Sequence, residues 1–448
     1  MWHKCALGGR ESPSFPARSP LLRHRAPFKR TRRRLPRAQS GVIRARASAR
    51  YGPEHEGTHH MTVTTLLKPA SIRKRPSPKI STSWQPFLSH LPSTLTEGWR
   101  ALTTEGHYGE PFFQPEWFVA YAQAFLDREP SHLITAYAGE RLVGVLPVVH
   151  KEHFFGNIPA RTLSGLSGIH SSRFDVVHDP SLSDVITASM WESLKRERDW
   201  TVLELLDVPE DGAAHRILQA AVLDGFLGCT WSTRRMPYMK LNQHDPFGPC
   251  PATSRTFRHR LASKSRKLGE QHPLTLKAHT DLTQSALDNF LALESKGWKG
   301  GNRSAIACSP QTLLFYRCVA QEAAHRGYLK IYSLEKNGSP ISMHLGLQMQ
   351  NRYYAPKVAY DEDLSRYSPG QVLVERVIQD LSSQGVSTYD FLGPSAPWKR
   401  VWTLSIRSHH NIYIFRPTVT GRILHAAITK AAVPMRRLKH SYFGDPQG

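Results

Sequence analysis

The hydrophobic pattern of the chain changes its period from one segment to the next. Between residues 372 and 381, leucine, valine and isoleucine recur every three or four positions, which predicts a helix with one buried face. Between residues 341 and 349, apolar residues alternate with polar ones, which predicts a half-buried strand. Segments of both kinds follow one another from Trp84 onward, and this alternation favours an α/β fold.

The same order of predicted elements occurs twice along the chain. Residues 84–250 contain a helix, a hairpin that turns at Gly139-Glu140, and then alternating helices and strands. Residues 251–418 repeat this layout around a hairpin that turns at Asn337-Gly338, the strongest short signal for a hairpin. We therefore expect a duplicated domain.

The positive charge of the protein is concentrated at its start. The formal net charge is +23 over 448 residues, and residues 1–60 hold fourteen Lys/Arg against three Asp/Glu. Because this segment has few aromatics and residues 61–83 are rich in Pro, Ser and Lys, we expect a disordered basic leader and linker over 1–83. We interpret the leader as having no structural role, upstream of a start at Met61. An organelle transit peptide is the alternative interpretation.

Cysteine usage and hydropathy exclude several classes of protein. The five cysteines form no C-x-x-C pair and have no histidine at ligand spacing, so neither a metal site nor a disulfide framework is predicted. This usage fits a reducing compartment, and we expect a cytoplasmic protein. No apolar run reaches the ~18 residues of a membrane helix. The basic C-terminal tail over 419–448 packs against the second domain in our interpretation, with peripheral membrane contact as the alternative.

The helix that contains residues 372–381 has a well-marked start. Ser368 precedes Pro369, and Gln371 follows three positions after the serine, which predicts a capping box. The free N–H groups of such a first turn attract an anion, because the helix dipole and the unpaired donors both favour negative charge. Gly370 has no side chain to hold a phosphate away from these groups. An ordinary helix cap is the alternative interpretation.

Three stretches of the second half resemble a known family of enzymes. They read "ESKGWKGGNRSAI", "YYAPKVAYDEDLSRYSPGQVL" and "YDFLGPSAPWKRVW", within about residues 285–405. Together with the order of elements, they are similar to the GNAT superfamily acyltransferases of the CelD-like type. That group is associated with cellulose and exopolysaccharide biosynthesis and is related to Fem-type transferases with two GNAT-like halves.

The resemblance implies tandem GNAT-like domains with a mixed, mostly antiparallel sheet flanked by helices. Residues 84–250 would form a degenerate N-terminal domain, and residues 251–418 the catalytic C-terminal one. The implied reaction is transfer of an acetyl or other acyl group from acyl-CoA to an amine or hydroxyl of a sugar or polysaccharide precursor. We expect direct transfer, because no Ser or Cys stands beside a plausible His/Asp relay.

Two alternatives to this function remain open at the level of sequence. A Fem-type transferase would take its group from aminoacyl-tRNA, and the basic helix predicted over 253–270 could hold phosphates of coenzyme A or of tRNA, or could be a solvated face. The other alternative belongs to a different class of protein. A basic nucleic-acid-binding protein would bind its nucleic acid mainly through the positive charge of the leader. Because the chain lacks any recognised reading motif, we expect no DNA partner.

The resemblance also suggests which residues contact the donor. The helix after Ser368 would point its N-terminus at the coenzyme A diphosphate, and the strand over 352–360 would lie beside the acyl arm. Pro356 removes one N–H from that strand and predicts a bulge, which would open a gap for the pantetheine. The predicted donor contacts are Lys357, Ser368, Pro369, Gly370, Gln371 and Val372.

Acyl transfer needs a base within hydrogen-bond reach of the acceptor and a proton for the leaving sulfur. The candidate catalytic residues are the carboxylates Asp361, Glu294 and Asp390. Glu362, which follows Asp361 directly, is weighed beside it as a base. Tyr367 would be the proton donor, a role that a tyrosine has in many GNAT enzymes. The predicted acceptor contacts are Trp298, Lys299, His344, Tyr360 and Lys399. The alternative interpretations are structural: Asp361 would cap a turn, Glu294 would pair with Lys299 on the surface, and the aromatic residues would pack in the core.

Overall fold

The computed structural model describes residues 61–62, 78–87, 90–104, 108–126, 129–155, 158–244, 247, 254–282 and 284–430. The chain divides into two units, residues 1–57 and residues 58–448, and every described residue belongs to the second. Our predictions for residues 1–60, for most of the linker and for residues 431–448 lie outside the described residues. The first strand of the sheet proper begins at Ile80, inside the segment that we predicted as linker.

The elements of the described unit follow the predicted α/β alternation. The strands are β1 (Met61–Thr62), β2 (Ile80–Pro86), β3 (Ser131–Ala138), β4 (Arg141–Phe155), β5 (Ile158–Gly165), β6 (Val177–His178), β7 (Val202–Pro209), β8 (Leu227–Lys240), β9 (Leu274–His279), β10 (Ile331–Lys336), β11 (Ser339–Met349), β12 (Arg352–Tyr360), β13 (Thr388–Asp390) and β14 (Ile406–Phe415). The helices are α1 (Ser93–Thr104), α2 (Pro115–Phe125), α3 (Ser183–Arg196), α4 (Ala214–Leu223), α5 (Arg255–Leu268), α6 (Gln284–Lys296), α7 (Trp298–Gly301), α8 (Pro310–His325), α9 (Pro369–Ser383), α10 (Pro397–Arg400) and α11 (Val419–Lys430).

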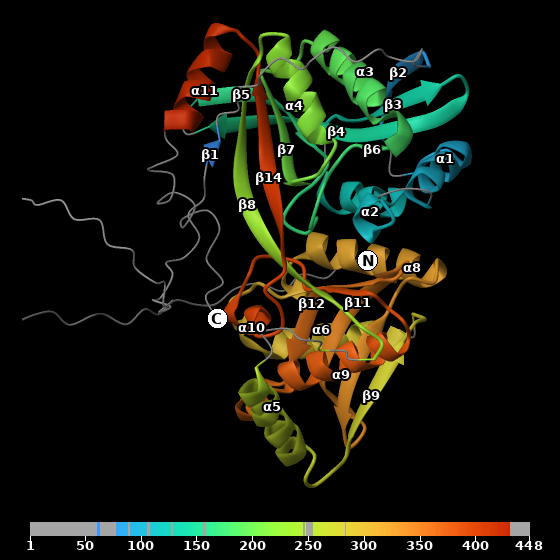
Figure 1. The fold of residues 1–448 in the computed structure, drawn as a ribbon, viewed down its shortest axis with the longest axis vertical. Helices are drawn as coiled ribbons and strands as arrows, with labels where there is room; N and C mark the ends of the chain where they lie inside the picture. Colours follow the sequence, from blue (N-terminus) through green and yellow to red (C-terminus); the bar gives the residue numbers. More distant parts are fainter. Residues whose placement is uncertain are drawn as a thin grey trace, which may run out of the picture. The chain divides into compact units, whose positions relative to one another are not determined.

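One mixed sheet connects the two halves. Its strands follow the order β2-β3-β4-β5-β7-β14-β8-β13-β12-β11-β10-β9, with β1 paired to β8 and β6 to β4. Most neighbours are antiparallel, and the parallel pairs are β5 with β7 and β12 with β13. Each half therefore builds four antiparallel strands, crosses back through a helix, and adds a parallel strand. This arrangement confirms the predicted fold class, a mostly antiparallel mixed sheet flanked by helices (Figure 1).

The last strands of the two halves are exchanged. β8 ends the first half in sequence, yet it pairs with β13 of the second half. β14 ends the second half, yet it lies between β7 and β8 of the first half. Figure 1 shows these two long strands running side by side through the middle of the unit. Neither half can complete its hydrogen-bonded sheet without a strand from the other.

The second half of the sheet is covered by helices on both faces (Figure 1). On one face, α6 and α8 pack through Phe290 and Phe315 against Leu345 of β11. On the other face, α9 packs through Val377 against Tyr353 of β12, together with residues of α5. Adjacent residues of a strand point to opposite faces, so Tyr353 and Tyr354 belong to different clusters of the core.

Two local predictions from the sequence are confirmed. Asn337 and Gly338 both have positive φ, 51° and 73°, as a two-residue hairpin turn between Lys336 and Ser339 requires. In β12, Lys357 pairs with Leu345 and Tyr354 with Leu347, so β12 carries one residue more than β11 between these pairs. That bulge lies where Pro356 removes a donor. Among the described residues, no helix is long and apolar enough to cross a membrane.

A buried ion network joins the halves beside the exchanged strands. Arg173 is buried, and its guanidinium pairs with Glu110 of the first half and, at 2.8 Å, with Asp390 at the end of β13. Arg352 also reaches Glu110 at 3.0 Å, and Arg407 reaches Asp390 at 3.2 Å. Buried charges are tolerated only when they are paired in this way. The network therefore fixes the position of β13 relative to the first half.

We predict that Arg173→Met destabilises the protein by about 3 kcal/mol, because Glu110 and Asp390 stay buried and both lose the cation that lies between them. The free energy of unfolding from urea titrations measures this change. The control is Arg161→Met, which breaks the exposed pair of Arg161 with Asp199 and should change stability little. If the two variants unfold at the same urea concentration, the buried ion network does not determine the stability of the protein.

Candidate active site

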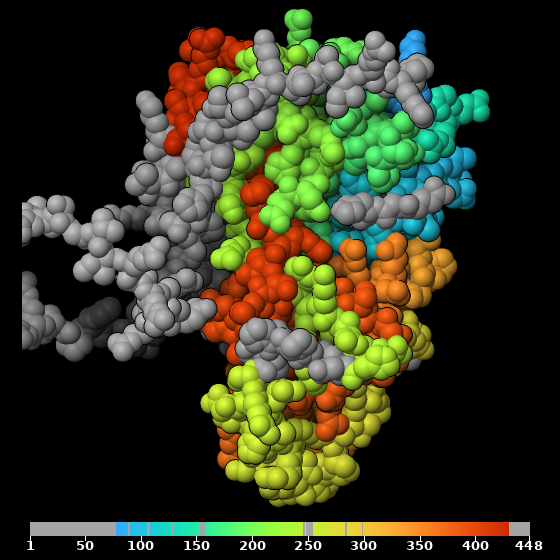
Figure 2. Space-filling view, in the orientation of Figure 1, coloured from blue at the N-terminus to red at the C-terminus, as the bar shows by residue number. Residues whose placement is uncertain are grey.

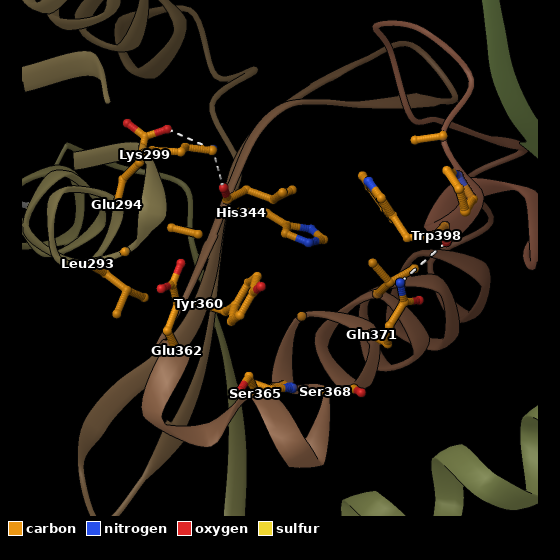
Figure 3. A pocket seen from close by; sticks show the side chains of 18 residues that line it. Leu293, Glu294, Lys299, His344, Tyr360, Glu362, Ser365, Ser368, Gln371 and Trp398 are labelled. Atoms are coloured by element: carbon orange, nitrogen blue, oxygen red, sulfur yellow. Dashed lines mark hydrogen bonds and ion pairs between the residues drawn. The ribbon is translucent and has the colours of Figure 1, made fainter. Parts of the chain in front are cut away.

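A cavity of about 390 Å³ lies in the second half of the protein (Figure 3). Its walls are the end of β12 from Val358 to Tyr360, the first turn of α9, the segment 396–398 at the start of α10, and residues of α6 and α7. Because α6 and α9 cover opposite faces of the sheet, the cavity reaches both faces. It therefore passes the edge of β12.

The cavity exists because β12 separates from its parallel neighbour. β12 pairs with β13 only through Arg352–Tyr354, and the bulge at Pro356 turns the rest of the strand away. The carbonyl of Val358 accepts a hydrogen bond from Lys299 at 2.7 Å, so it points away from β11. Since the N–H and C=O of one residue in a strand point to the same side, the Val358 N–H also faces the open edge.

The first turn of α9 differs from the predicted capping box. Ser368 adopts a left-handed conformation with φ of 53°, and its hydroxyl accepts a hydrogen bond from the ammonium of Lys264 at 2.8 Å, not from the helix. The Gln371 side chain accepts from the Trp402 indole at 2.6 Å and donates to the Trp398 carbonyl at 3.3 Å. The capping box was therefore a wrong prediction, because distant side chains take both of its partners.

The donors of this turn are also fewer than the sequence indicated. The N–H groups of Gln371 and Val372 both donate to the carbonyl of Ser368, at 3.0 and 3.1 Å. The side chain of Val372 is buried in the core, so this residue does not line the cavity. What remains for an anion is the Gly370 N–H, the positive end of the helix dipole, and the nearby Lys264.

Glu294 and Lys299 form a fixed pair at the α6 end of the cavity. The side chain of Glu294 is 1% exposed, and its Oε1 accepts from Lys299 at 2.9 Å. Its Oε2 accepts from the Ile306 N–H at 2.9 Å. Both oxygens are therefore engaged. Glu294 is buried and Lys299 is only partly exposed, so the pair does not lie on the open surface as the structural interpretation supposed. Through its second bond, Lys299 anchors the Val358 carbonyl at the open edge.

His344 projects from β11 into the cavity (Figure 3). It is 1% exposed, and burial lowers its pKa to about 3, so the imidazole is neutral at neutral pH. Its Nδ1 lies 3.5 Å from the Tyr389 hydroxyl. Its Nε2 has no hydrogen-bond partner within the part of the chain that the structure describes. Tyr360 also lines the cavity, next to Gly370.

Lys357 lies close to this site but not among the residues that line the cavity. Its ammonium stands 5.2 Å from the centre of the Tyr316 ring. Burial lowers its pKa to about 8, and the nearby Glu294 opposes that shift. Because Lys357 is adjacent to Val358, whose side chain has the opposite orientation, it belongs to the face of the sheet that α8 covers.

The other predicted site residues lie apart from the cavity. Asp361 accepts from the Asp363 N–H at 3.1 Å and so caps the turn Glu362–Tyr367, as its structural interpretation proposed. Asp390 belongs to the ion network, and Tyr367 packs at the edge of the core with Arg366 over its ring.

Lys399 holds the loop before α10. Its ammonium donates to the carbonyls of Leu392 and Pro394, and burial lowers its pKa to about 8. It therefore fixes the loop that leads to the cavity wall. Trp298 begins α7, but its side chain lies outside the described residues.

Three residues of the site are not among the predicted catalytic, donor-contact or acceptor-contact residues, although Glu362 was weighed as a base and Lys264 belongs to the basic helix predicted over 253–270. Glu362 lines the cavity and approaches Gly297 so closely that a Cβ there would lie 3.0 Å from its Oε1. Trp398 forms part of the opposite wall, and Lys264 arrives from α5, a helix that is largely exposed (Figure 2). The place of Glu362 directly after the strand was the signal for it, whereas no local pattern indicates the contact of Lys264 with Ser368.

Comparison with known proteins gives a family for the second half of the chain. Residues 255–400 match the family described as "Acetyltransferase (GNAT) domain". No curated protein is similar enough to count as a match.

Solved structures of low sequence identity are also similar. FemX is 11% identical with a TM-score of 0.49, over 77% of this chain and 99% of that one. The C-terminal domain of a putative lysylphosphatidylglycerol synthetase from Agrobacterium fabrum is 10% identical with a TM-score of 0.46, over 75% and 95%. A tandem GNAT protein from the clavulanic acid biosynthesis pathway is 12% identical with a TM-score of 0.39, over 75% and 100%.

The family match covers β12, α9 and α10, the elements that form the open edge, the anion-favouring turn and the opposite wall of the cavity. Residues 255–400 thus form a GNAT acetyltransferase domain, and the protein is an acyltransferase.

Proposed function

We propose that this acyltransferase transfers an acetyl or other acyl group directly from coenzyme A to an amine or hydroxyl of a sugar or polysaccharide precursor. The observation that carries the proposal is the path of the cavity. It begins at the first turn of α9, passes the open edge of β12, and ends beside Glu294 and Glu362. A donor at one end and an acceptor at the other would meet at Val358.

The donor end suits a diphosphate. The Gly370 N–H and the helix dipole favour an anion, and Lys264 adds a cation held 2.8 Å from the Ser368 hydroxyl. The pantetheine arm of coenzyme A would then follow the gap between β12 and β13. A volume of about 390 Å³ lies within the range of small-molecule sites, which supports a bound arm.

The open edge suits the transfer step. The acceptor nitrogen or oxygen forms a bond to the thioester carbon, the carbonyl oxygen takes up negative charge, and the carbon–sulfur bond then breaks. The Val358 N–H faces this edge and donates to the charged oxygen. The acceptor gives up one proton, and the leaving thiolate takes up one proton to become the free thiol.

Glu362 is the carboxylate that we assign as the base for the acceptor. It lines the cavity beside Gly297, whereas Asp361 and Asp390 do not line it. Glu294 has both oxygens engaged by Lys299 and Ile306, so its role is to position the edge of β12. The saccharide character of the acceptor rests on the resemblance of the three quoted stretches, with the Trp398 ring in the wall as a surface for stacking.

We expect acetyl-CoA and free coenzyme A to raise the melting temperature of the protein, since a ligand that binds only the folded state stabilises it. Titration calorimetry then gives the affinities, and release of thiol with glucosamine and other amino sugars tests the acceptor. Longer acyl-CoAs and aminoacyl-tRNA are compared in the same assay. Stabilisation by aminoacyl-tRNA alone would overturn the coenzyme A donor in favour of a Fem-type reaction.

We predict that Gly370→Asp weakens coenzyme A binding by about tenfold or more, because a carboxylate beside the diphosphate repels it. The matched control is Gly370→Asn, which has the same shape without the charge. A Cβ at Gly370 would meet only the Tyr360 ring at ordinary contact distance, 3.4 Å, so both variants should fold. The difference between them should shrink with added salt. Equal affinities would place the diphosphate elsewhere.

We predict that Glu362→Gln lowers kcat by about 100-fold while the affinity for acetyl-CoA stays the same, because the amide cannot take the proton of the acceptor. The control is Asp363→Asn, which alters an exposed neighbour outside the cavity wall and should keep full activity. Steady-state rates of thiol release and calorimetry provide both measurements. A Glu362→Gln variant with unchanged kcat would exclude this residue as the base.

A further inference from the structure

One polar atom in the cavity wall, Nε2 of His344, takes no part in the transfer step described above. Nε2 of His344 is buried and has no hydrogen-bond partner in the described part of the chain, although the residue lines the cavity. Buried polar atoms are almost always paired, so an unpaired one in a cavity wall indicates a missing ligand group. Figure 3 shows the ring pointing into the space between Tyr360 and Trp398.

The partner of the other ring nitrogen determines what Nε2 can do. Nδ1 lies 3.5 Å from the hydroxyl of Tyr389, which is fully buried and whose pKa is raised by burial. The phenol therefore keeps its proton, and a phenol donates more readily than it accepts. When the hydroxyl donates to Nδ1, the proton of the neutral imidazole must sit on Nε2. His344 thus presents an N–H donor to the cavity.

The position of this donor along the cavity is set by strand register. His344 on β11 is the direct partner of Val358 on β12. Paired residues have side chains on the same face, so the imidazole stands beside the residue whose N–H faces the open edge. A backbone donor and a side-chain donor therefore converge on the part of the cavity where the thioester must lie.

We propose that His344 donates its Nε2–H to the carbonyl oxygen of the acyl group, as a second donor beside the Val358 N–H. This inference rests on the proposed function, because the acyl thioester is its ligand. The imidazole stays neutral and transfers no proton, so the proton balance of the reaction is unchanged. Its effect increases as the carbonyl oxygen gains negative charge, which favours the transition state over bound substrate.

A base role for His344 is disfavoured by the same geometry. Its Nε2 already carries the proton, and no carboxylate contacts the ring to support an imidazolium in the described residues. Tyr389 acts as a positioning residue, because its hydroxyl selects the tautomer.

The experiment compares wild type with His344→Ala and His344→Gln in binding two ligands. One is acetyl-CoA, and the other is S-ethyl-CoA, which has a methylene in place of the carbonyl. Wild type should prefer acetyl-CoA, and His344→Ala should lower that preference by about fivefold, the effect of one net hydrogen bond, because the Val358 N–H remains as a donor. His344→Gln should keep part of it, because its amide N–H can donate. Free coenzyme A should bind all three equally.

Infrared spectra of acetyl-CoA labelled with ¹³C at the carbonyl give a second readout. Binding to wild type should lower the carbonyl stretching frequency, and His344→Ala should reverse part of that shift. The control is His410→Ala, which changes a half-buried histidine of β14 outside the cavity and should leave the shift intact. If His344→Ala does not fold, Tyr389→Phe tests the same donor. Without the hydroxyl, the imidazole proton is no longer held on Nε2, so the carbonyl shift should weaken.

The outcomes separate the two claims. If wild type binds acetyl-CoA and His344→Ala keeps both the ligand preference and the carbonyl shift, the inference is overturned and the proposed function stands. If His344→Ala and His344→Gln lose free coenzyme A as strongly as acetyl-CoA, the residue has only a structural role, and the inference also fails. If wild type binds no coenzyme A derivative, the proposed function fails first.

Discussion

The structure of the site depends on one constraint, the failure of β12 to stay paired with β13 beyond Tyr354. Pro356 cannot donate to a neighbouring strand, and the extra residue at the bulge turns the chain away. Everything chemical about the cavity follows from this separation. It exposes the backbone at Val358, it gives an elongated ligand a route between the faces, and it brings α6 and α9 to the two ends of one space.

Side chains from distant parts of the chain hold that separation in place. Lys299 links the buried Glu294 to the exposed carbonyl of Val358, while Lys264 and Gln371 fix the turn at the other end through bonds to Ser368 and Trp398. An open strand edge would otherwise be free to shift or to pair. These cations and amides act as supports for the backbone, which is why Glu294 is a poor candidate for proton transfer.

Local patterns predicted much of the fold and less of the site. Periodicity and the Asn337-Gly338 turn depend on neighbouring residues, so the sequence was enough for the hairpins and for the bulge. The capping box at Ser368 failed because Lys264, 104 positions away, took the serine hydroxyl. Likewise, no residue near Asp390 in the sequence indicates that Arg173 will pair with it. The role of Asp390 in the ion network could therefore not be predicted from its neighbours in the sequence. Contacts made across the fold decide which polar residues remain available for chemistry.

The exchange of β8 and β14 has a consequence for how the protein is made. The sheet of the first half has a gap between β7 and β8 that only residues 406–415 can fill. During synthesis, the first half must therefore wait for almost the whole described chain to leave the ribosome before its central strands acquire their neighbours. Such long-range pairing slows folding and leaves apolar strand edges uncovered in the meantime. Two independent domains of the same length would each complete their sheets without this delay.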